Sequence, residues 1–348
     1  MKVFAPLRAL RDERTTEDTE NEGKLTTMAP KLNFSRATAT VLFFLAFSIG
    51  MGTSQASREF HRTLRVSLAE AVSLQVDLVE GDLRIAYSHD GEVSVSVTAQ
   101  NVAIIDPESL STRLVIAQTG NRIEVSERPG SESPNLKLAY TIDVPYRTEV
   151  HASVQRGKQT VTGIMGPVMA DVGVGDIKAS YISLGVAAEA RTGNLSFEVV
   201  GGRIEARTDQ GKIACQRAPQ GIRAETQDGD ISLSVVGAST AIVKSGGGRI
   251  DVGGARGTLR ISTNAGDLHV KAVPHEDWQL SSRSVTVRVE LPPSAGFDLD
   301  AGTTSGKFVI GRGDLTKPDG RPRHVTQQVN GGGKRIEVRT DDGDIVIV

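Results

Sequence analysis

Residues 204–215, IEARTDQGKIAC, and residues 222–233, IRAETQDGDISL, repeat one pattern 18 residues apart. Each copy carries Ile, Ala and Thr at the positions seven, five and three before its glycine, and apolar residues alternate again after it. Strict alternation of apolar and polar residues is typical of a strand with one buried face. Each copy therefore predicts two short strands joined by a bend at the glycine.

The glycine of this pattern recurs through the middle of the chain. Its copies, each followed two positions later by Ile or Leu, lie 18 or 19 residues apart, at Gly175, Gly193, Gly211, Gly229, Gly248 and Gly266. One copy buries too few side chains to offset the conformational entropy of ordering it, so the copies must stack. The spacing predicts an all-β fold, a single-stranded β-helix or β-solenoid with about 18 residues and two short strands per coil. A meander of hairpins is the alternative, although it rarely keeps so constant a spacing.

Stacking puts residues one repeat apart side by side, so outward positions form columns. The column four positions before the glycine reads Glu189, Arg207, Glu225 and Lys244. Its signs alternate, as cross-strand pairing prefers. The column directly after the glycine reads Asp176, Asn194, Lys212, Asp230, Arg249 and Asp267. Cations interrupt the acids there, so we predict no row of carboxylates for calcium and interpret both columns as solvated charge.

The beginning of the sequence has the features of a secretion signal. Residues 37–50, ATATVLFFLAFSIG, follow Lys31 and Arg36 and precede a small-residue cleavage site that ends at Ala56. The run is shorter than the about 20 apolar residues of a membrane span, which favours a cleaved signal peptide over an uncleaved anchor. Because a signal peptide begins its chain, we expect Met28 to be the true start.

Five parts are expected along the chain. They are a mis-assigned extension (1–27), a signal peptide (28–56), an N-terminal β region of the solenoid (57–145), the regular repeat (146–272) and C-terminal coils with loop insertions (273–348). Residues 273–283, VPHEDWQLSSR, break the rhythm and are predicted to be a loop. We expect a secreted or periplasmic protein of the cell envelope, without a membrane span once the signal is removed.

The composition excludes several classes of protein. The formal net charge of −2 gives no reason to expect nucleic acid as a partner. The single cysteine, Cys215, rules out an intramolecular disulfide and stands at a core position of the repeat. Patterns for a phosphate-binding loop, a serine nucleophile elbow or a zinc helix are missing from the sequence, so we predict no catalytic, cofactor-binding or metal-binding residues.

Several segments resemble a known family. The strand YTIDVP (140–145) and the spaced units DVGVGDIKAS, ARTGNLSFEV and AETQDGDISL are similar to the bacterial adhesin-like domain-of-unknown-function family, of the auto-transporter adhesin head type. The resemblance covers about residues 60–348. It implies a single-stranded β-helix exposed in or beyond the envelope, and it brings no catalytic residues.

One break in the repeat is a candidate ligand-binding loop. His275, Glu276, Asp277 and Trp278 join the only tryptophan to ionisable groups, as a sugar-binding or catalytic cluster would. The alternative is that Trp278 is a plug that covers the side of the solenoid.

The sequence favours a non-enzymatic, adhesin-like β-solenoid that presents a rigid surface to an envelope component, a glycan or a protein. A carbohydrate-active β-helix enzyme and an envelope-stress or regulatory partner-binding module are the alternatives. The final DIVIV (344–348) has no polar cap, so we also expect self-association through a C-terminal edge strand.

Overall fold

The computed structural model describes residues 58–100, 107–128, 136–234, 236–311 and 323–348. The described residues belong to one compact unit, Ser54–Val348. The expectations for residues 1–27, for the signal peptide at 28–56 and for Met28 lie outside the described residues. Within those residues, no helix has the length and apolar character needed to cross a bilayer.

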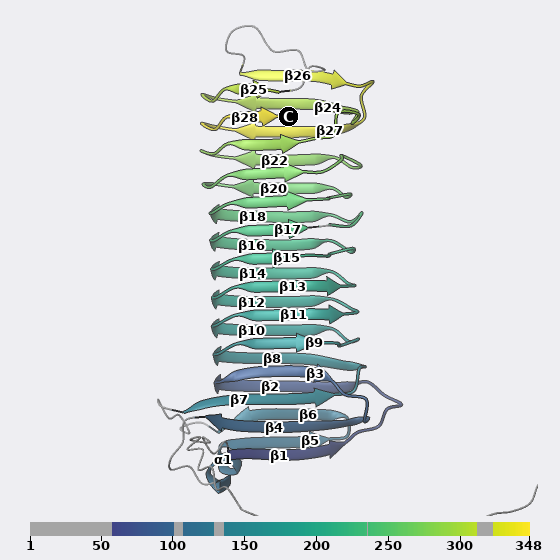
Figure 1. The fold of residues 1–348 in the computed structure, drawn as a ribbon, viewed down its shortest axis with the longest axis vertical. Helices are drawn as coiled ribbons and strands as arrows, with labels where there is room; N and C mark the ends of the chain where they lie inside the picture. The colour runs from purple at the N-terminus through teal and green to yellow at the C-terminus, as the bar shows by residue number, and fades with distance from the viewer. Residues whose placement is uncertain (1–57, 101–106, 129–135, 235, 312–322) are drawn as a thin grey trace, which may run out of the picture. The chain divides into compact units, whose positions relative to one another are not determined.

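The described residues form two sheets of 14 strands each and one short helix, α1 (Pro107–Arg113) (Figure 1). Sheet A contains, in spatial order, β1 (Arg58–Arg65), β4 (Glu92–Gln100), β7 (Lys137–Val144), β3 (Asp82–Tyr87), β9 (Gln159–Thr162), β11 (Ile177–Ile182), β13 (Leu195–Val200), β15 (Ile213–Cys215), β17 (Ile231–Ser234), β19 (Ile250–Gly253), β21 (Leu268–Lys271), β23 (Val287–Glu290), β28 (Ile345–Ile347) and β25 (Phe308–Ile310). Sheet B contains β26 (His324–Val329), β24 (Phe297–Thr303), β27 (Lys334–Thr340), β22 (Trp278–Ser282), β20 (Leu259–Thr263), β18 (Ala241–Gly247), β16 (Ile222–Asp228), β14 (Ile204–Gln210), β12 (Val186–Thr192), β10 (Val168–Val174), β8 (Thr148–Arg156), β2 (Val72–Glu80), β6 (Arg122–Glu127) and β5 (Leu114–Thr119).

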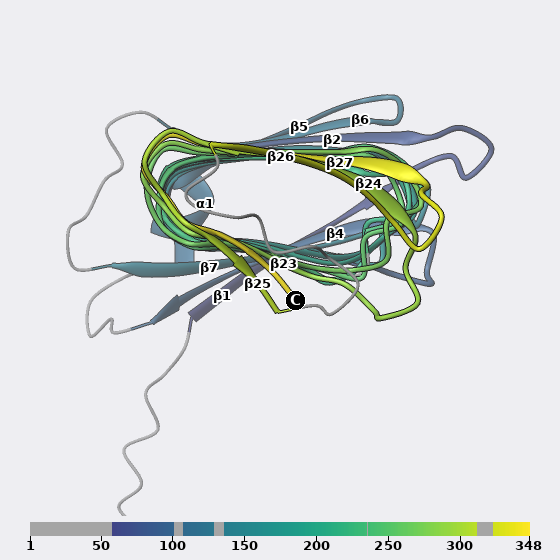
Figure 2. The same cartoon turned by 90° about the horizontal axis from the view of Figure 1, so that it is seen from above.

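The repeat of the sequence appears as the register of the parallel strands. From β8 to β23 the chain alternates between the sheets. The strands from β10 to β21 pair on both sides with strands one repeat away, as Ile204 does with Val186 and Ile222. The two sheets face each other (Figure 2), and their alternate apolar side chains form one continuous core. An all-β, solenoid-like stack of two long sheets is thereby confirmed.

The ladder glycines are required by close backbone contact between repeats. Gly211 has a φ of +147°, and a Cβ built on it would lie 2.0 Å from the carbonyl oxygen of Gly193. Gly229 repeats both features one coil further, with its Cβ position 2.0 Å from the oxygen of Gly211. Only a residue without a side chain allows adjacent repeats to pack at strand spacing here.

At the N-terminal side, the parallel stack is covered by antiparallel strands. Among the described strands of residues 57–145, β2 and β3 alone pair directly with the regular repeat, at β8 and β9. Strands β1, β4 and β7 form antiparallel pairs beside β3, and the hairpin of β5 and β6 lies beside β2. The buried hydroxyl of Tyr140 donates a hydrogen bond to Glu127, which joins β7 to that hairpin. The N-terminal region is therefore a folded cap on the stack.

Two expectations for residues 273–348 are wrong. Residues 273–283 are not all loop, because Trp278–Ser282 is the strand β22 and pairs with β20 and β27. The last strand, β28, is not an edge strand, because it pairs with β23 on one side and β25 on the other. Its companion β27 lies likewise between β22 and β24. In the described part of the chain, the edges at this end are β25 and β26.

Candidate functional site

The loop predicted to bind a ligand fastens two strands together. The carboxylate of Glu276 accepts a hydrogen bond from Lys334 Nζ at 3.0 Å, and Asp277 Oδ1 accepts one from the backbone nitrogen of Arg335 at 2.9 Å. His275 is exposed and donates from Nδ1 to the carbonyl oxygen of Val273 at 2.9 Å. The two acids therefore attach β27 beside the start of β22, which is a structural role.

Trp278 is fully buried, so its indole is withdrawn from the surface of this loop. It occupies the core position that Leu259 holds in the preceding repeat and Ile336 in the following one. Its Nε1 finds no hydrogen-bond partner among the described residues. Trp278 is therefore a side chain of the continuous core rather than a cover on the side of the stack, and its indole is not at the surface as a sugar platform would be.

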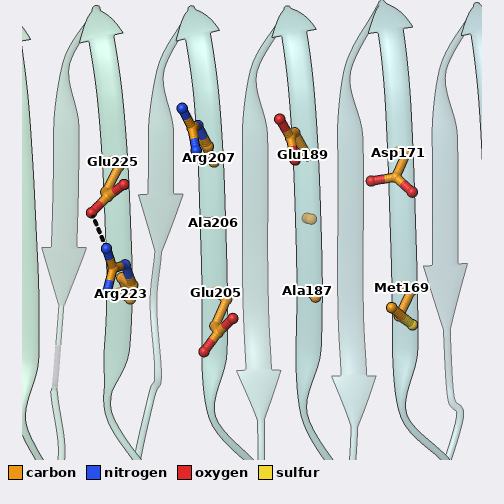
Figure 3. A pocket seen from close by; sticks show the side chains of 10 residues that line it. Met169, Asp171, Ala187, Glu189, Glu205, Ala206, Arg207, Arg223 and Glu225 are labelled. Carbon is orange, nitrogen blue, oxygen red and sulfur yellow. Dashed lines mark hydrogen bonds and ion pairs between the residues drawn. The ribbon is translucent and has the colours of Figure 1, made fainter.

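A shallow groove runs along the outer face of sheet B. In Figure 3, the short side chain of Ala187 lies between the longer Met169 and Glu205 on neighbouring strands, which leaves a depression of about 320 Å³. Charged residues surround it, from β10, β12, β14 and β16: Asp171, Glu189, Glu205, Arg207, Arg223 and Glu225. We call this surface, with its extensions below, the sheet B groove.

Two further depressions extend the groove along the stack. One, of about 710 Å³, shares Asp171 and Glu189 with the first and continues past Gly173 to Arg156. The other, of about 530 Å³, shares Arg207 and Glu225 and continues to residues of β18 and β20. The hollows form where the lining side chains are short. The strand spacing of about 4.8 Å sets the distance between the charged side chains around each hollow.

The charges of the groove follow the predicted column. Strand register places Glu189, Arg207, Glu225 and Lys244 side by side in that order. Glu225 accepts a hydrogen bond from Arg223 at 2.7 Å on its own strand and lies 3.7 Å from Lys244 Nζ on the next. The register confirms that acidic and basic side chains alternate along this column. The charge of Glu225 is partly neutralised by its two cationic neighbours.

Asp171 extends the column with a second acid beside Glu189. Burial raises the pKa of the Asp171 carboxyl, and the negative charge of Glu189 raises it further, while His151 opposes the shift. The His151 Nε2 atom lies 3.9 Å from Asp171 Oδ2. The two adjacent acids therefore form an acidic section of the groove, with His151 beside Asp171 and Arg207 in register beside Glu189.

The column after the ladder glycines has a structural role that the sequence did not reveal. Asp176 Oδ1 accepts a hydrogen bond from the backbone nitrogen of Asn194 at 3.0 Å, and Asn194 Oδ1 accepts one from that of Lys212 at 2.9 Å. Asp230 Oδ1 does the same for the nitrogen of Arg249 at 2.8 Å. These side chains cap backbone groups of the next repeat at the bend. The recurrence of Asp and Asn at this position is the signal that could have shown it.

A second charged cluster lies on sheet A. His269 Nδ1 is 3.2 Å from Asp251 Oδ1, and its Nε2 is 3.2 Å from Glu290 Oε1, without good hydrogen-bond alignment at the second contact. Hydrogen bonds from Arg288 and Lys271 lower the pKa of Glu290 to about 2. The positive and negative charges of this cluster compensate one another.

Among the described residues, no group of three or more His, Cys, Asp or Glu side chains could hold a metal ion.

A third cluster surrounds Asp300 on β24. Its carboxylate accepts hydrogen bonds from His324 at 2.6 Å, from Arg339 at 2.8 Å and from Arg335. Burial would raise the pKa of Asp300, but these three hydrogen bonds outweigh it and lower the pKa to about 2. The cluster joins β24, β26 and β27, so it stabilises the end of sheet B.

Solved structures with a similar course of the chain come from several bacteria. A "putative adhesin" from Bacteroides fragilis is 13% identical with a TM-score of 0.33, and the match covers 84% of this chain and 97% of that one. A "putative adhesin" from Parabacteroides distasonis is 12% identical with a TM-score of 0.34, over 84% and 98%. A "putative cell adhesion protein" from Clostridium sporogenes is 11% identical with a TM-score of 0.21, over 83% and 99%. A comparison with curated proteins found no match.

The family comparison covers most of the repeat. Residues 108–348 match the model of the family described as Toastrack DUF4097, which is more than half of the 348 residues. The matched range contains β5 to β28, and therefore the regular repeat with its ladder glycines, the sheet B groove and the strands β27 and β28. The chain belongs to the Toastrack DUF4097 family.

Proposed function

We propose that this protein is a non-enzymatic, adhesin-like binding module, a single-stranded β-helix that presents the sheet B groove to a partner outside the cytoplasm. The observation that carries the proposal is the groove itself. Charged side chains from β10, β12, β14 and β16 stand in register along a rigid face, with hollows between them. Such a face suits an extended polar ligand that repeats its contacts from strand to strand, for example an envelope glycan or a peptide segment.

The charge of the groove also changes along its length. Asp171 and Glu189 form an acidic section, whereas Arg207 and Lys244 interrupt the acids further along. A ligand with cationic groups opposite the acidic section and acceptors opposite the cations would complement this arrangement. Because the charges are exposed, we expect the affinity to fall as the salt concentration rises.

A binding screen on the purified protein tests the proposal, with glycans, peptidoglycan fragments and envelope proteins as probes. Arg207→Glu changes the sign of a charge in the groove and should weaken binding about ten-fold, which corresponds to about 1.4 kcal/mol. Lys178→Glu is a matched control, because Lys178 is an exposed residue on the outer face of sheet A and lies away from the groove. Equal binding by both variants and the unmodified protein would exclude the groove as the contact surface.

A second candidate function has one observation in its favour. Asp171 and Glu189 are neighbouring carboxylates, one with a raised pKa, as in the acid and base pair of many glycoside hydrolases. Both carboxylates are exposed on the outer face of sheet B, whereas catalytic sites use enclosure to exclude water. We therefore expect no turnover of polysaccharides. Turnover that Asp171→Asn abolishes and Asp251→Asn preserves would establish an enzyme instead.

The extracytoplasmic location is part of the proposal and rests on residues 28–56 of the sequence. N-terminal sequencing of the protein from its natural host tests it. We expect the mature chain to begin at Ser57, and retention of residues 1–27 would contradict the assignment of Met28 as the start.

A further inference from the structure

Three of the four tyrosines of the chain lie close together on the side of sheet A where its strands end in turns. Tyr87, Tyr146 and Tyr181 have exposed fractions of 37%, 47% and 58%, whereas the fourth tyrosine is buried in the core. They are far apart in the sequence. The pairing of β3 with β9 and of β9 with β11, whose strands lie side by side in Figure 1, brings the positions of Tyr87 and Tyr181 near each other. The ring of Tyr146 contacts that of Tyr87. Exposed aromatic side chains that cluster on a rigid scaffold are typical of binding surfaces.

Gly163 separates two of these tyrosines. Ala86 pairs with Thr162, and Thr162 pairs with Ser180, so the register places Gly163 between Tyr87 and Tyr181. The backbone nitrogen of Gly163 donates to the oxygen of Ser180 at 3.1 Å, which confirms this adjacency. A Cβ at position 163 would lie only 3.2 Å from the Cβ of Tyr87, so a side chain there would crowd that tyrosine, and glycine keeps this flank of Tyr87 free of side-chain atoms.

The width of this space fits one flat ring. Tyr87 and Tyr181 are two strand spacings apart, which is about 9.6 Å between their backbones. A ring held between two aromatic faces needs about 7–8 Å between those faces, from van der Waals contacts of about 3.5–4.0 Å on each side. The residues Tyr87, Gly163 and Tyr181, with Tyr146 beside them, are called the tyrosine slot.

One wall of the slot is fixed by its neighbours. The Tyr87 hydroxyl is 2.8 Å from His89 Nδ1, and the Tyr87 ring makes edge contacts with His89 and with Tyr146, at centroid distances of 4.5 and 6.0 Å. Tyr146 is attached to the next coil in turn, because its carbonyl oxygen accepts a hydrogen bond from Met165 at 2.7 Å. The ring of Tyr87 is therefore held before any ligand arrives.

The other wall stands on a strained backbone. Tyr181 has a φ of +56°, a conformation that L-residues with side chains adopt rarely. Glycine occupies this turn position one coil earlier, at Gly163 with a φ of +74°. Val199, opposite Tyr181 in the next coil, also has a positive φ, of +54°. The positive φ therefore belongs to this turn of the repeat, and Tyr181 adopts it at a conformational cost that glycine avoids.

We propose that the tyrosine slot binds a pyranose ring of a neutral glycan chain. Its tyrosines are uncharged aromatic side chains with hydroxyl tips, which complement the apolar faces and hydroxyl edges of a sugar. The exposed Met165 and Leu184 continue the surface along the edge. These five side chains are far fewer than the about 20–30 residues per side of a stable protein interface, so a second copy of the chain is the poorer fit.

The test measures binding of cellohexaose and chitohexaose to the full protein by calorimetry. Tyr87→Ala and Tyr181→Ala should each weaken binding about ten-fold, and Gly163→Asn should abolish it, because asparagine tolerates a positive φ and fills the slot. Met169→Ala, an exposed apolar residue of the sheet B groove, is the matched control and should bind like the unmodified protein.

A further variant separates loss of the site from loss of the fold. Tyr181→Gly relieves the backbone strain, so it should raise the melting temperature while it weakens sugar binding. Failure of both hexasaccharides to bind, or equal binding by Gly163→Asn, would overturn the proposal. The slot is separate from the sheet B groove. Loss of binding in Arg207→Glu therefore reports on the proposed function alone, and loss in Gly163→Asn reports on the slot alone.

Discussion

Replacement of a ladder glycine by alanine should be among the most damaging single changes in the molecule, and Gly211→Ala is the clearest case. The alanine would have to adopt a φ of +147°, which costs about 1–3 kcal/mol for a residue with a side chain. Its Cβ would also lie 2.0 Å from the oxygen of Gly193, so the two repeats must separate by more than 1 Å.

Separation of the repeats weakens the hydrogen bonds on both sides of the bend. The nitrogen of Gly193 donates to Gln210 at 2.8 Å, and that of Leu195 donates to Lys212 at 2.8 Å. Two such bonds contribute about 1–3 kcal/mol together. With the backbone strain, we expect Gly211→Ala to lower the free energy of unfolding by about 2–6 kcal/mol, a large part of the stability of an ordinary domain.

Three other glycines separate the two effects. Gly120 has a φ of +60° and open space around its Cβ position, so Gly120→Ala reports strain alone, about 1–2 kcal/mol. At Gly173 the Cβ position is 2.5 Å from the oxygen of Gln155 without a positive φ, so Gly173→Ala reports the collision alone. Gly253 has neither problem, since its nearest neighbour is 3.9 Å away, and Gly253→Ala should be close to neutral.

Urea denaturation followed by circular dichroism measures the four variants, and hydrogen exchange locates the damage. Exchange is needed because stacked repeats can open locally without a single cooperative transition. We expect faster exchange in Gly211→Ala at the two repeats that meet at this bend. A stability of Gly211→Ala within about 1 kcal/mol of Gly253→Ala would refute the argument that backbone contact fixes these glycines.

Further predictions concern three buried or clustered groups. Burial raises the pKa of the Cys215 thiol to about 12, so the native protein should resist a thiolate-selective reagent at neutral pH and react after unfolding; fast native labelling would contradict this. The lowered pKa of Asp300 means that its stabilising effect is complete above the unfolded value of about 3.9 and is lost as the pH falls towards about 2. Asp300→Asn should therefore flatten the acid branch of a stability profile, and an unchanged branch would refute the assignment. Trp278→Ala should lower the free energy of unfolding by about 3–5 kcal/mol in urea denaturation, because it empties a core position; a loss under 1 kcal/mol would count against a packed core at this position.

The regular repeat could be predicted because its signals are local. Period two defines each strand, and the ladder glycine marks each bend, so Ile204 and Ile222 were placed in one inward column by spacing alone. One coil escaped detection because the bend after β22 carries Val285 where a glycine was expected. The structure shows this equivalence, since a Cβ on Gly343 would meet the oxygen of Val285. Without the glycine, and with a tryptophan at the core position, the segment looked like a loop.

The spatial order of the last strands and the tyrosine slot could not be predicted for a different reason. Periodicity assigns β27 to a coil but does not say which coil lies next to it, since several neighbours would bury Ile336 and Val338 equally well. The slot combines Tyr87 from the irregular N-terminal cap with Tyr181 from a second, less regular turn. Neither residue belongs to the column that revealed the repeat.

The insertion of β27 and β28 into the stack has a consequence for assembly. The ribosome delivers residues 297–310 before residues 334–347, yet β24 and β25 reach the stack only through β27 and β28. Addition of coils in the order of synthesis must therefore stop at β22 and β23. Their outer edges stay unpaired until β27 and β28 have been synthesised. Until then β24 has β26 as its partner but no position on the stack. The nascent protein exposes unpaired strand edges at this stage, when a chaperone or another growing chain could pair with them.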